Sequence, residues 1–159
     1  WLGVEHANSI WLWTALIVTV LTGLLDNLDG AVAVISGRTS RAGYVLDSVA
    51  DRFSDALLMG ALWALGAPGI VVALAVFIGF VEEYARARAA AAGVSEVGVV
   101  SISERPTRIV VVAVFLGLCA LAPYGISVTT WATYGAWLAF AVAVIGAVQV
   151  GVALTARLR

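Results

Sequence analysis

Two pairs of aspartates, each with helical spacing, stand out in a largely apolar part of the chain. Asp26 and Asp29 are three residues apart, and Asp47 and Asp51 are four residues apart. Side chains at these spacings lie on one face of an α-helix. If the two segments are neighbouring antiparallel helices joined near residues 37–43, both pairs lie at the same end and face each other. An ionisable residue within a membrane-embedded helix costs about 2.5–3.5 kcal/mol, so four together require a compensating cation.

The cations that suit this cluster are hard divalent metal ions. Carboxylate oxygens without a nearby His or Cys favour Mg²⁺ or Mn²⁺ over zinc. An arginine would also neutralise carboxylates, but only Arg52 lies within the two helices nearby. Four aspartates are sufficient to hold two metal ions about 3.5–4 Å apart, as in enzymes that displace phosphoryl groups. We therefore expect a two-metal site formed by Asp26, Asp29, Asp47 and Asp51.

Small residues continue the two aspartate faces. Gly30, Ala33 and Gly37 follow the first pair at helical spacing, and Gly43 precedes the second pair by four positions. Such residues allow membrane helices to pack closely. Beside carboxylates they also leave room for a flat ligand or a phosphate against the backbone, and the spacing alone leaves both interpretations open.

The composition indicates that the elements carrying these residues lie in a membrane. Of the 159 residues, 62% are hydrophobic and 12% are charged, and the mean hydropathy is +1.03, whereas an average soluble domain has about 25% charged residues. A soluble globule, a disordered chain and a basic nucleic-acid-binding domain all fit poorly, so no nucleic acid partner is expected. Apolar stretches of about 20 residues predict transmembrane helices. We expect five of them, at 9–36, 45–65, 70–91, 106–122 and 131–156.

The arginines predict how these helices are oriented. All nine basic residues are arginines, and most lie in the connections after the first and third helices or at the C-terminus, which the positive-inside rule assigns to the cytoplasm. The six tryptophans lie near the opposite helix ends, as in an interfacial belt. The first residue is then external, with no signal peptide before it. We expect residues 1–159 to form one all-α integral membrane bundle of the plasma membrane, with five spans here and six with an upstream helix.

The aspartates and small residues also form a signature. It resembles that of the CDP-alcohol phosphatidyltransferases, D-x2-D-G-x2-A-R-x8-G-x3-D-x3-D. The fixed positions present here are Asp26, Asp29, Gly30, Ala33, Gly43, Asp47 and Asp51. The one departure is Val34, which stands where the family has Arg. The signature covers residues 26–51, and the helical layout of the remainder is similar to the six-span fold of the family.

The resemblance implies an enzyme that transfers a phosphatidyl group from CDP-diacylglycerol to a polar alcohol and releases CMP, on the cytoplasmic side of the bilayer. It implies that the four aspartates bind two Mg²⁺ or Mn²⁺ ions and that Asp51 is the base for the acceptor hydroxyl. It also implies that Gly30, Ala33 and Gly43 line the cytidine pocket. Metal ions compensate charge on a diphosphate, and a carboxylate beside the attacking oxygen removes its proton.

The family arginine that Val34 replaces is associated with the diphosphate. Arg38, one turn further on, is our candidate to bind CDP in its place. Arg41 lies in the same connection and is the alternative.

Three arginines near the third connection are candidates for binding the acceptor: Arg86, Arg105 and Arg108. Because a guanidinium binds phosphate through two parallel hydrogen bonds, they favour a phosphorylated polyol, such as glycerol 3-phosphate or an inositol phosphate, over serine. The alternative for Arg86 is an ion pair with Glu82, four residues earlier. The alternative for the other two is a topological role with contacts to anionic lipid.

Three further residues are expected to have supporting roles. Arg52 and Asp55 are three residues apart and are expected to form an ion pair. Asp55 continues the stripe of the second aspartate pair one turn deeper and is expected to support the site from behind. Cys119, the one cysteine, lies in an apolar run and is expected to be a buried, inert thiol.

Two other functions remain open. A carboxylate cluster is also found in cation-binding membrane transporters, but here the acids gather at one end and no polar route crosses the bilayer. An inactive family member that binds only nucleotide or lipid is the other alternative, and Val34 is its sole support. A homodimer is neither required nor excluded by the sequence.

Overall fold

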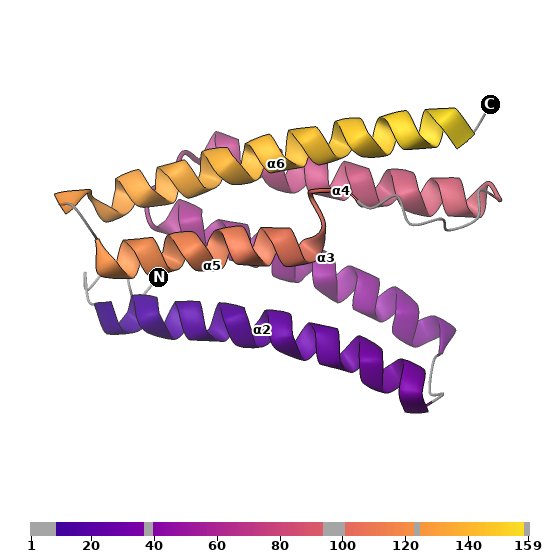
Figure 1. Ribbon diagram of the computed structural model, residues 1–159, viewed down its shortest axis with the longest axis horizontal. Coiled ribbons are helices and arrows are strands. Elements are labelled where there is room, and N and C mark those ends of the chain that lie inside the picture. The colour runs from indigo at the N-terminus through magenta and orange to yellow at the C-terminus, as the bar shows by residue number, and fades with distance from the viewer. Residues whose placement is uncertain (1–8, 37–39, 94–100, 123–124, 158–159) are drawn as a thin grey trace.

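The computed structural model is a bundle of five α-helices that run alternately in opposite directions (Figure 1). It describes residues 9–36, 40–93, 101–122 and 125–157, and within the first range the side chains of residues 10–26 and 28. The five helices expected from the apolar segments are confirmed within a few residues. They are α2 (Ser9–Ser36), α3 (Arg41–Ala64), α4 (Gly69–Ala91), α5 (Arg105–Leu121) and α6 (Val128–Arg157).

The ends of the helices follow from local chemistry. Ser40 caps α3, because its side-chain oxygen accepts a hydrogen bond from the Gly43 N–H at 2.9 Å. Pro106 lies in the first turn of α5, where its missing N–H leaves no hydrogen bond unmade. The turn between α3 and α4 contains Gly66 with φ +100°, and a Cβ there would lie 2.9 Å from Thr129 of α6. This turn therefore requires glycine both for its backbone angle and for its packing.

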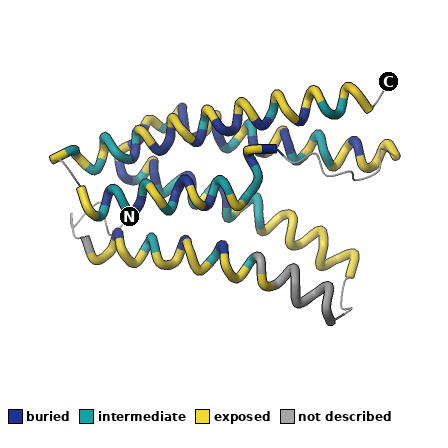
Figure 2. The backbone as a smooth tube through the Cα atoms, in the orientation of Figure 1, coloured by how far each residue is buried: buried dark blue, intermediate teal, exposed yellow. Residues whose placement is uncertain are grey.

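The helices do not pack in the order expected from the chain. We expected α2 and α3 to pack side by side, but α2 packs along α5, and α3 packs against α4, α5 and α6 (Figure 1). Residues 40–50 at the start of α3 are all exposed (Figure 2). The reason is that α5 begins between these two helices. Its first residue, Arg105, contacts Asp26 of α2 and Asp51 of α3.

The core lies between α3, α4, α5 and α6. Leu62, Val112 and Leu116 are almost completely buried there. Small residues along one side of α6 allow the neighbouring backbones to approach, as is common when membrane helices pack; these residues are Ala132, Gly135, Ala136, Ala139, Ala143 and Gly146. The polar residues of the cluster described below lie beyond this apolar core, toward the end where α5 begins.

Among the described residues, one helix is long and apolar enough by itself to cross a membrane, namely α6. The other expected spans differ in length or charge. Helix α5 has only 17 residues, and α3 carries Asp47, Asp51, Arg52 and Asp55 within its first four turns. The prediction of five helices is therefore confirmed, while hydropathy and length identify only one of them as a span.

Gly146 provides a test of the packing between α6 and the segment before α5. A Cβ at this position would lie 2.5 Å from Glu82 Oε1 and would also overlap the side chain of Ser103. We expect Gly146→Ala to destabilise the protein by about 1–3 kcal/mol, because both neighbours are buried and must shift. Gly151→Ala on the same helix is the control, since a Cβ there meets nothing within 4 Å. Thermal unfolding followed by tryptophan fluorescence should show a lower Tm for Gly146→Ala only; equal Tm values would contradict the packing.

Candidate functional site

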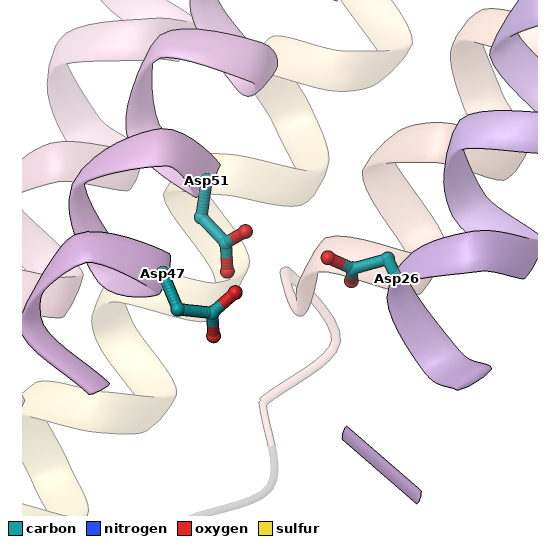
Figure 3. Close-up of side chains that lie close together, drawn as sticks. All are labelled: Asp26, Asp47 and Asp51. Atoms are coloured by element: carbon teal, nitrogen blue, oxygen red, sulfur yellow. The ribbon is translucent and has the colours of Figure 1, made fainter. Parts of the chain in front are cut away.

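Three of the four signature aspartates come together between α2 and α3. Asp26 lies on α2, and Asp47 and Asp51 lie one turn apart on α3, with their carboxylates directed toward the space between the helices (Figure 3). One oxygen from each carboxylate lies within 4.8 Å of the other two. We call these three residues the aspartate triad. The expected convergence is thus confirmed for the triad, while the side chain of Asp29 lies outside the described part of the structure.

Arg105, the first residue of α5, contacts two members of the triad. One Arg105 nitrogen, Nη1, contacts Oδ1 of both Asp26 and Asp51. The Arg105 side chain is only 12% exposed, so this contact is poorly screened by solvent. The sequence analysis considered Arg52 as a neighbour of the carboxylates because it lies within the two aspartate helices, whereas the arginine that contacts the triad comes from α5. Arg105 is far away in the sequence, and it reaches the triad because α5 packs along α2 and begins beside α3.

Asp55 lies one turn deeper on α3 and links three arginines. Its Oδ2 accepts a hydrogen bond from Arg108 Nη1 at 2.6 Å and lies 3.5 Å from Arg52 Nη2. Its Oδ1 lies 3.7 Å from Arg105 Nε. The expected Arg52–Asp55 ion pair is confirmed. The Asp55 side chain is only 6% exposed, so it is a buried anion with cations on several sides.

Glu83 on α4 extends the cluster to a third helix. It lies 3.3 Å from Arg86 and 3.7 Å from both Arg52 and Arg108. The spacing predicted an ion pair between Arg86 and Glu82, but the structure gives Arg86 its ion pair with Glu83. Glu82 points instead into the protein, where it is 2% exposed and lies close to Gly146 of α6. We refer to Asp55, Glu83, Arg52, Arg86, Arg105 and Arg108 as the arginine cluster.

The segment just before α5 is held by its neighbours. Gln149 of α6 accepts a hydrogen bond from the Ile102 N–H at 2.8 Å. The Ser101 hydroxyl accepts one from Arg86 at 3.0 Å, and the Ser103 carbonyl accepts one from Arg108 Nε at 2.9 Å. These contacts position the start of α5, and with it Arg105. The sequence analysis missed them; a single Gln in the apolar helix α6 was the one available signal.

Comparison with known proteins identifies the family of the chain. A family model described as CDP-alcohol phosphatidyltransferase matches residues 2–151. The chain belongs to the CDP-alcohol phosphatidyltransferase family. Its members are transferases of phospholipid biosynthesis in membranes, and they use divalent metal ions.

Several curated relatives of the chain carry related names. The phosphatidylinositol phosphate synthase of Corynebacterium glutamicum is 35% identical over 138 residues, which cover 81% of this chain and 61% of the relative. That of Mycolicibacterium smegmatis is 37% identical over 135 residues, covering 78% and 59%. The archaetidylinositol phosphate synthase of Pyrococcus horikoshii is 34% identical over 124 residues, covering 74% and 64%. The chain thus spans about three fifths of the length of these relatives. No solved structure matches the chain significantly.

The aspartate triad fits divalent metal ions by its donor set. All three ligand candidates are carboxylates, and Asp51 and Asp26 are partly buried, with side chains 20% and 30% exposed. Oxygen ligands of this kind suit Mg²⁺ and Mn²⁺.

Cys119 is buried and hydrogen-bonds the Val128 carbonyl at 3.5 Å at the start of α6, as expected of an inert thiol remote from the triad.

The predicted substrate-binding residues fall into two groups. All three arginines predicted to bind the acceptor, Arg86, Arg105 and Arg108, belong to the arginine cluster. Gly43, predicted to line the cytidine pocket, lies in the first turn of α3 and donates its N–H to the Ser40 cap. Gly30, Ala33 and Val34 are described only as part of the α2 backbone, and Arg38 lies outside the described residues.

Proposed function

We propose that the chain transfers a phosphatidyl group from CDP-diacylglycerol to a hydroxyl of a phosphorylated polyol, with an inositol phosphate as the preferred acceptor, and releases CMP. The observation that carries this proposal is the direct contact between the aspartate triad and the arginine cluster. It combines a group of oxygen ligands with buried cations that suit a phosphate. The names of the relatives support the choice of an inositol phosphate over glycerol 3-phosphate.

The aspartate triad is proposed to bind the metal ions and to supply the catalytic base. Asp26, Asp47 and Asp51, together with Asp29, would hold two Mg²⁺ or Mn²⁺ ions, which when bound compensate the charge of the diphosphate and of the leaving CMP. Asp51 accepts the proton of the acceptor hydroxyl. The oxygen of that hydroxyl forms a bond to the phosphatidyl phosphorus while the bond from this phosphorus to the CMP oxygen breaks, so CMP leaves and the new phosphodiester forms.

The arginine cluster is proposed to bind the acceptor phosphate. Arg105 contacts the triad, and Arg108 lies behind it on the same helix, so a phosphate bound to them lies next to the carboxylates. Guanidinium groups bind phosphate through two hydrogen bonds at once. Arg86 at the edge of the cluster has a weaker claim, because Glu83 and Ser101 already engage it. An acceptor without a phosphate, such as serine, would leave these cations with no new partner.

The remaining substrate contacts are proposed from the family signature. Gly30, Ala33 and Gly43 are proposed to line the cytidine pocket, and Arg38 to contact the diphosphate in place of the family arginine at Val34. The first turns of α3 are exposed around Gly43 and leave this side accessible.

A membrane location is proposed for all five helices. The outward faces carry large exposed apolar side chains, including Leu24 at 56%, Leu57 at 75% and Phe77 at 62%; soluble monomers rarely expose contiguous apolar patches of this extent. The start of α3 and the ends of α4 and α6, which carry Arg41, Arg88 and Arg157, lie at one end of the bundle (Figure 1). The start of α2, the end of α3 and the start of α6, which carry Trp11, Trp63 and Trp131, lie at the other end (Figure 1). The arginine-bearing end, with the triad, is proposed to face the cytoplasm at the plasma membrane.

The proposal is tested by measuring CMP release from CDP-diacylglycerol by the purified chain. The assay uses Mg²⁺ or Mn²⁺ and a panel of acceptors: inositol phosphate, glycerol 3-phosphate, free inositol and serine. The expected result is the highest kcat/KM with inositol phosphate and little release with the two acceptors that lack phosphate. The absence of CMP release with every acceptor would contradict the proposal. Tracer ion flux in proteoliposomes without lipid turnover would favour a cation transporter instead.

A further inference from the structure

We infer that Asp55, which lies outside the family signature, is a positioning residue that orients the two arginines proposed to bind the acceptor phosphate. This inference rests on the proposed function and specifies how its acceptor site is built. It concerns a carboxylate that is in contact with three arginines of the cluster but is not part of the triad.

The two carboxylate oxygens of Asp55 contact different arginines. Oδ2 accepts a hydrogen bond from Arg108 at 2.6 Å, and Oδ1 faces Arg105 Nε at 3.7 Å. One buried carboxylate thus lies beside both guanidinium groups, with a hydrogen bond to Arg108 through one oxygen and a longer ion pair to Arg105 through the other. Such a carboxylate keeps two cations close together in spite of their mutual repulsion, which a dianionic phosphate requires of its binding site.

The contact between Asp55 and Arg108 borders a small cavity with a mostly apolar lining. This cavity between α3, α4 and α6 has Asp55 and Arg108 on its wall, and the rest of its lining is apolar, including Met59, Phe80 and Ala139. Within the described residues, Glu83 also lies 3.7 Å from Arg108, and the Ser103 carbonyl accepts a hydrogen bond from Arg108 Nε at 2.9 Å. Asp55 makes a shorter ion pair with Arg108 than Glu83 does, so together with Ser103 it orients the Arg108 guanidinium.

The buried pair of Asp55 and Arg108 is not explained by a contribution to the stability of the fold. A buried ion pair contributes little net stability, because desolvation offsets much of the attraction between its charges, whereas removing one partner is costly. A buried Asp–Arg pair beside the proposed reaction site is therefore explained better by its effect on geometry than by its effect on folding. Arg105 connects this geometry to the triad, because it contacts Asp26 and Asp51 with one nitrogen and faces Asp55 with another.

The experiment compares Asp55→Asn, Asp55→Glu and the control Glu104→Gln in the full chain. The control removes the same charge from a residue outside the arginine cluster, next to Arg105 in the sequence, and the glutamine oxygen can still accept the hydrogen bond that Glu104 Oε1 accepts from the Ser101 N–H at 3.3 Å. Two quantities are measured for each variant: the KM values for inositol phosphate and for CDP-diacylglycerol in the CMP-release assay, and the Kd for inositol phosphate by calorimetry. Calorimetry detects acceptor binding without turnover.

A positioning role predicts a selective effect on the acceptor. For Asp55→Asn we expect KM and Kd for inositol phosphate to rise at least ten-fold, with less than a three-fold change in KM for CDP-diacylglycerol. For Asp55→Glu, which keeps the charge but displaces it by one methylene, we expect a three- to ten-fold rise. Glu104→Gln should change either value less than three-fold. If Asp55→Asn fails to fold, Asp55→Glu decides the question, because neutralisation of charge alone predicts no change in that variant.

Two results would overturn the inference while leaving the proposed function intact. The first is an active wild-type chain whose Asp55 variants both retain wild-type affinity for inositol phosphate. The second is an equal rise in KM for both substrates, which would indicate a general structural role. A wild-type chain that releases no CMP with any acceptor would instead refute the proposed function, and the inference with it.

Discussion

Asp51→Asn is expected to lower CMP release at least about a thousand-fold. The substitution removes the proposed base, and general base catalysis alone contributes about 10²–10⁴-fold. It also removes one of the three carboxylates whose oxygens lie within 4.8 Å of one another, so binding of divalent ions weakens as well. The measurement is kcat for CMP release at saturating CDP-diacylglycerol, acceptor and Mn²⁺.

The matched control for this prediction is Ser48→Ala. Ser48 lies on α3 between Asp47 and Asp51 and is exposed. Its hydroxyl donates a hydrogen bond to the Tyr44 carbonyl of the same helix. We expect its kcat to stay within two-fold of the wild type. CMP release by Asp51→Asn at more than a tenth of the wild-type rate would remove Asp51 from the role of base.

Arg105→Gln is expected to have effects of opposite sign on turnover and on metal binding. Turnover with inositol phosphate should fall about a hundred-fold, since a charge-assisted contact to phosphate is lost. Mn²⁺ binding in the absence of substrate should tighten about ten-fold, which is about 1.4 kcal/mol. The physical reason is that Arg105 places a positive charge on Asp26 and Asp51, and a cation there opposes a second cation.

Arg88→Gln is the control for this prediction. Arg88 lies exposed in the last turn of α4, and its loss removes the same charge from the same end of the bundle. Both its Kd for Mn²⁺ and its kcat should stay within two-fold of the wild type. Weaker Mn²⁺ binding in Arg105→Gln would show that this arginine supports the metal site instead of competing with it.

The local parts of the site were predictable from the sequence. The pair Asp47 and Asp51 shares a face of α3 because a four-residue spacing does so in any α-helix, and the Arg52–Asp55 ion pair follows from the same geometry. The helices themselves were predictable within a few residues, because apolar runs bounded by Gly, Pro and Ser determine where they begin and end.

The long-range parts were not predictable. Helical spacing says which residues share a face, but it does not say which helices touch. Arg105 reaches Asp26 because α2 packs along α5 and not along α3. Asp55 gains its three arginines from α3 and α5, and Glu83 adds a third helix to the cluster. A sequence that supplies both acids and arginines at one end of a bundle allows many pairings, and only the packing selects among them.

The central claim is that the aspartate triad binds divalent metal ions, and a Mn²⁺ titration of the purified full-length chain tests it most directly. Free Mn²⁺ is followed by electron paramagnetic resonance for the wild type and for the double variant Asp26→Asn/Asp47→Asn, which leaves the proposed base in place. The prediction is saturable binding by the wild type and an affinity at least ten-fold weaker in the double variant. Equal Mn²⁺ binding by the two proteins would contradict the claim.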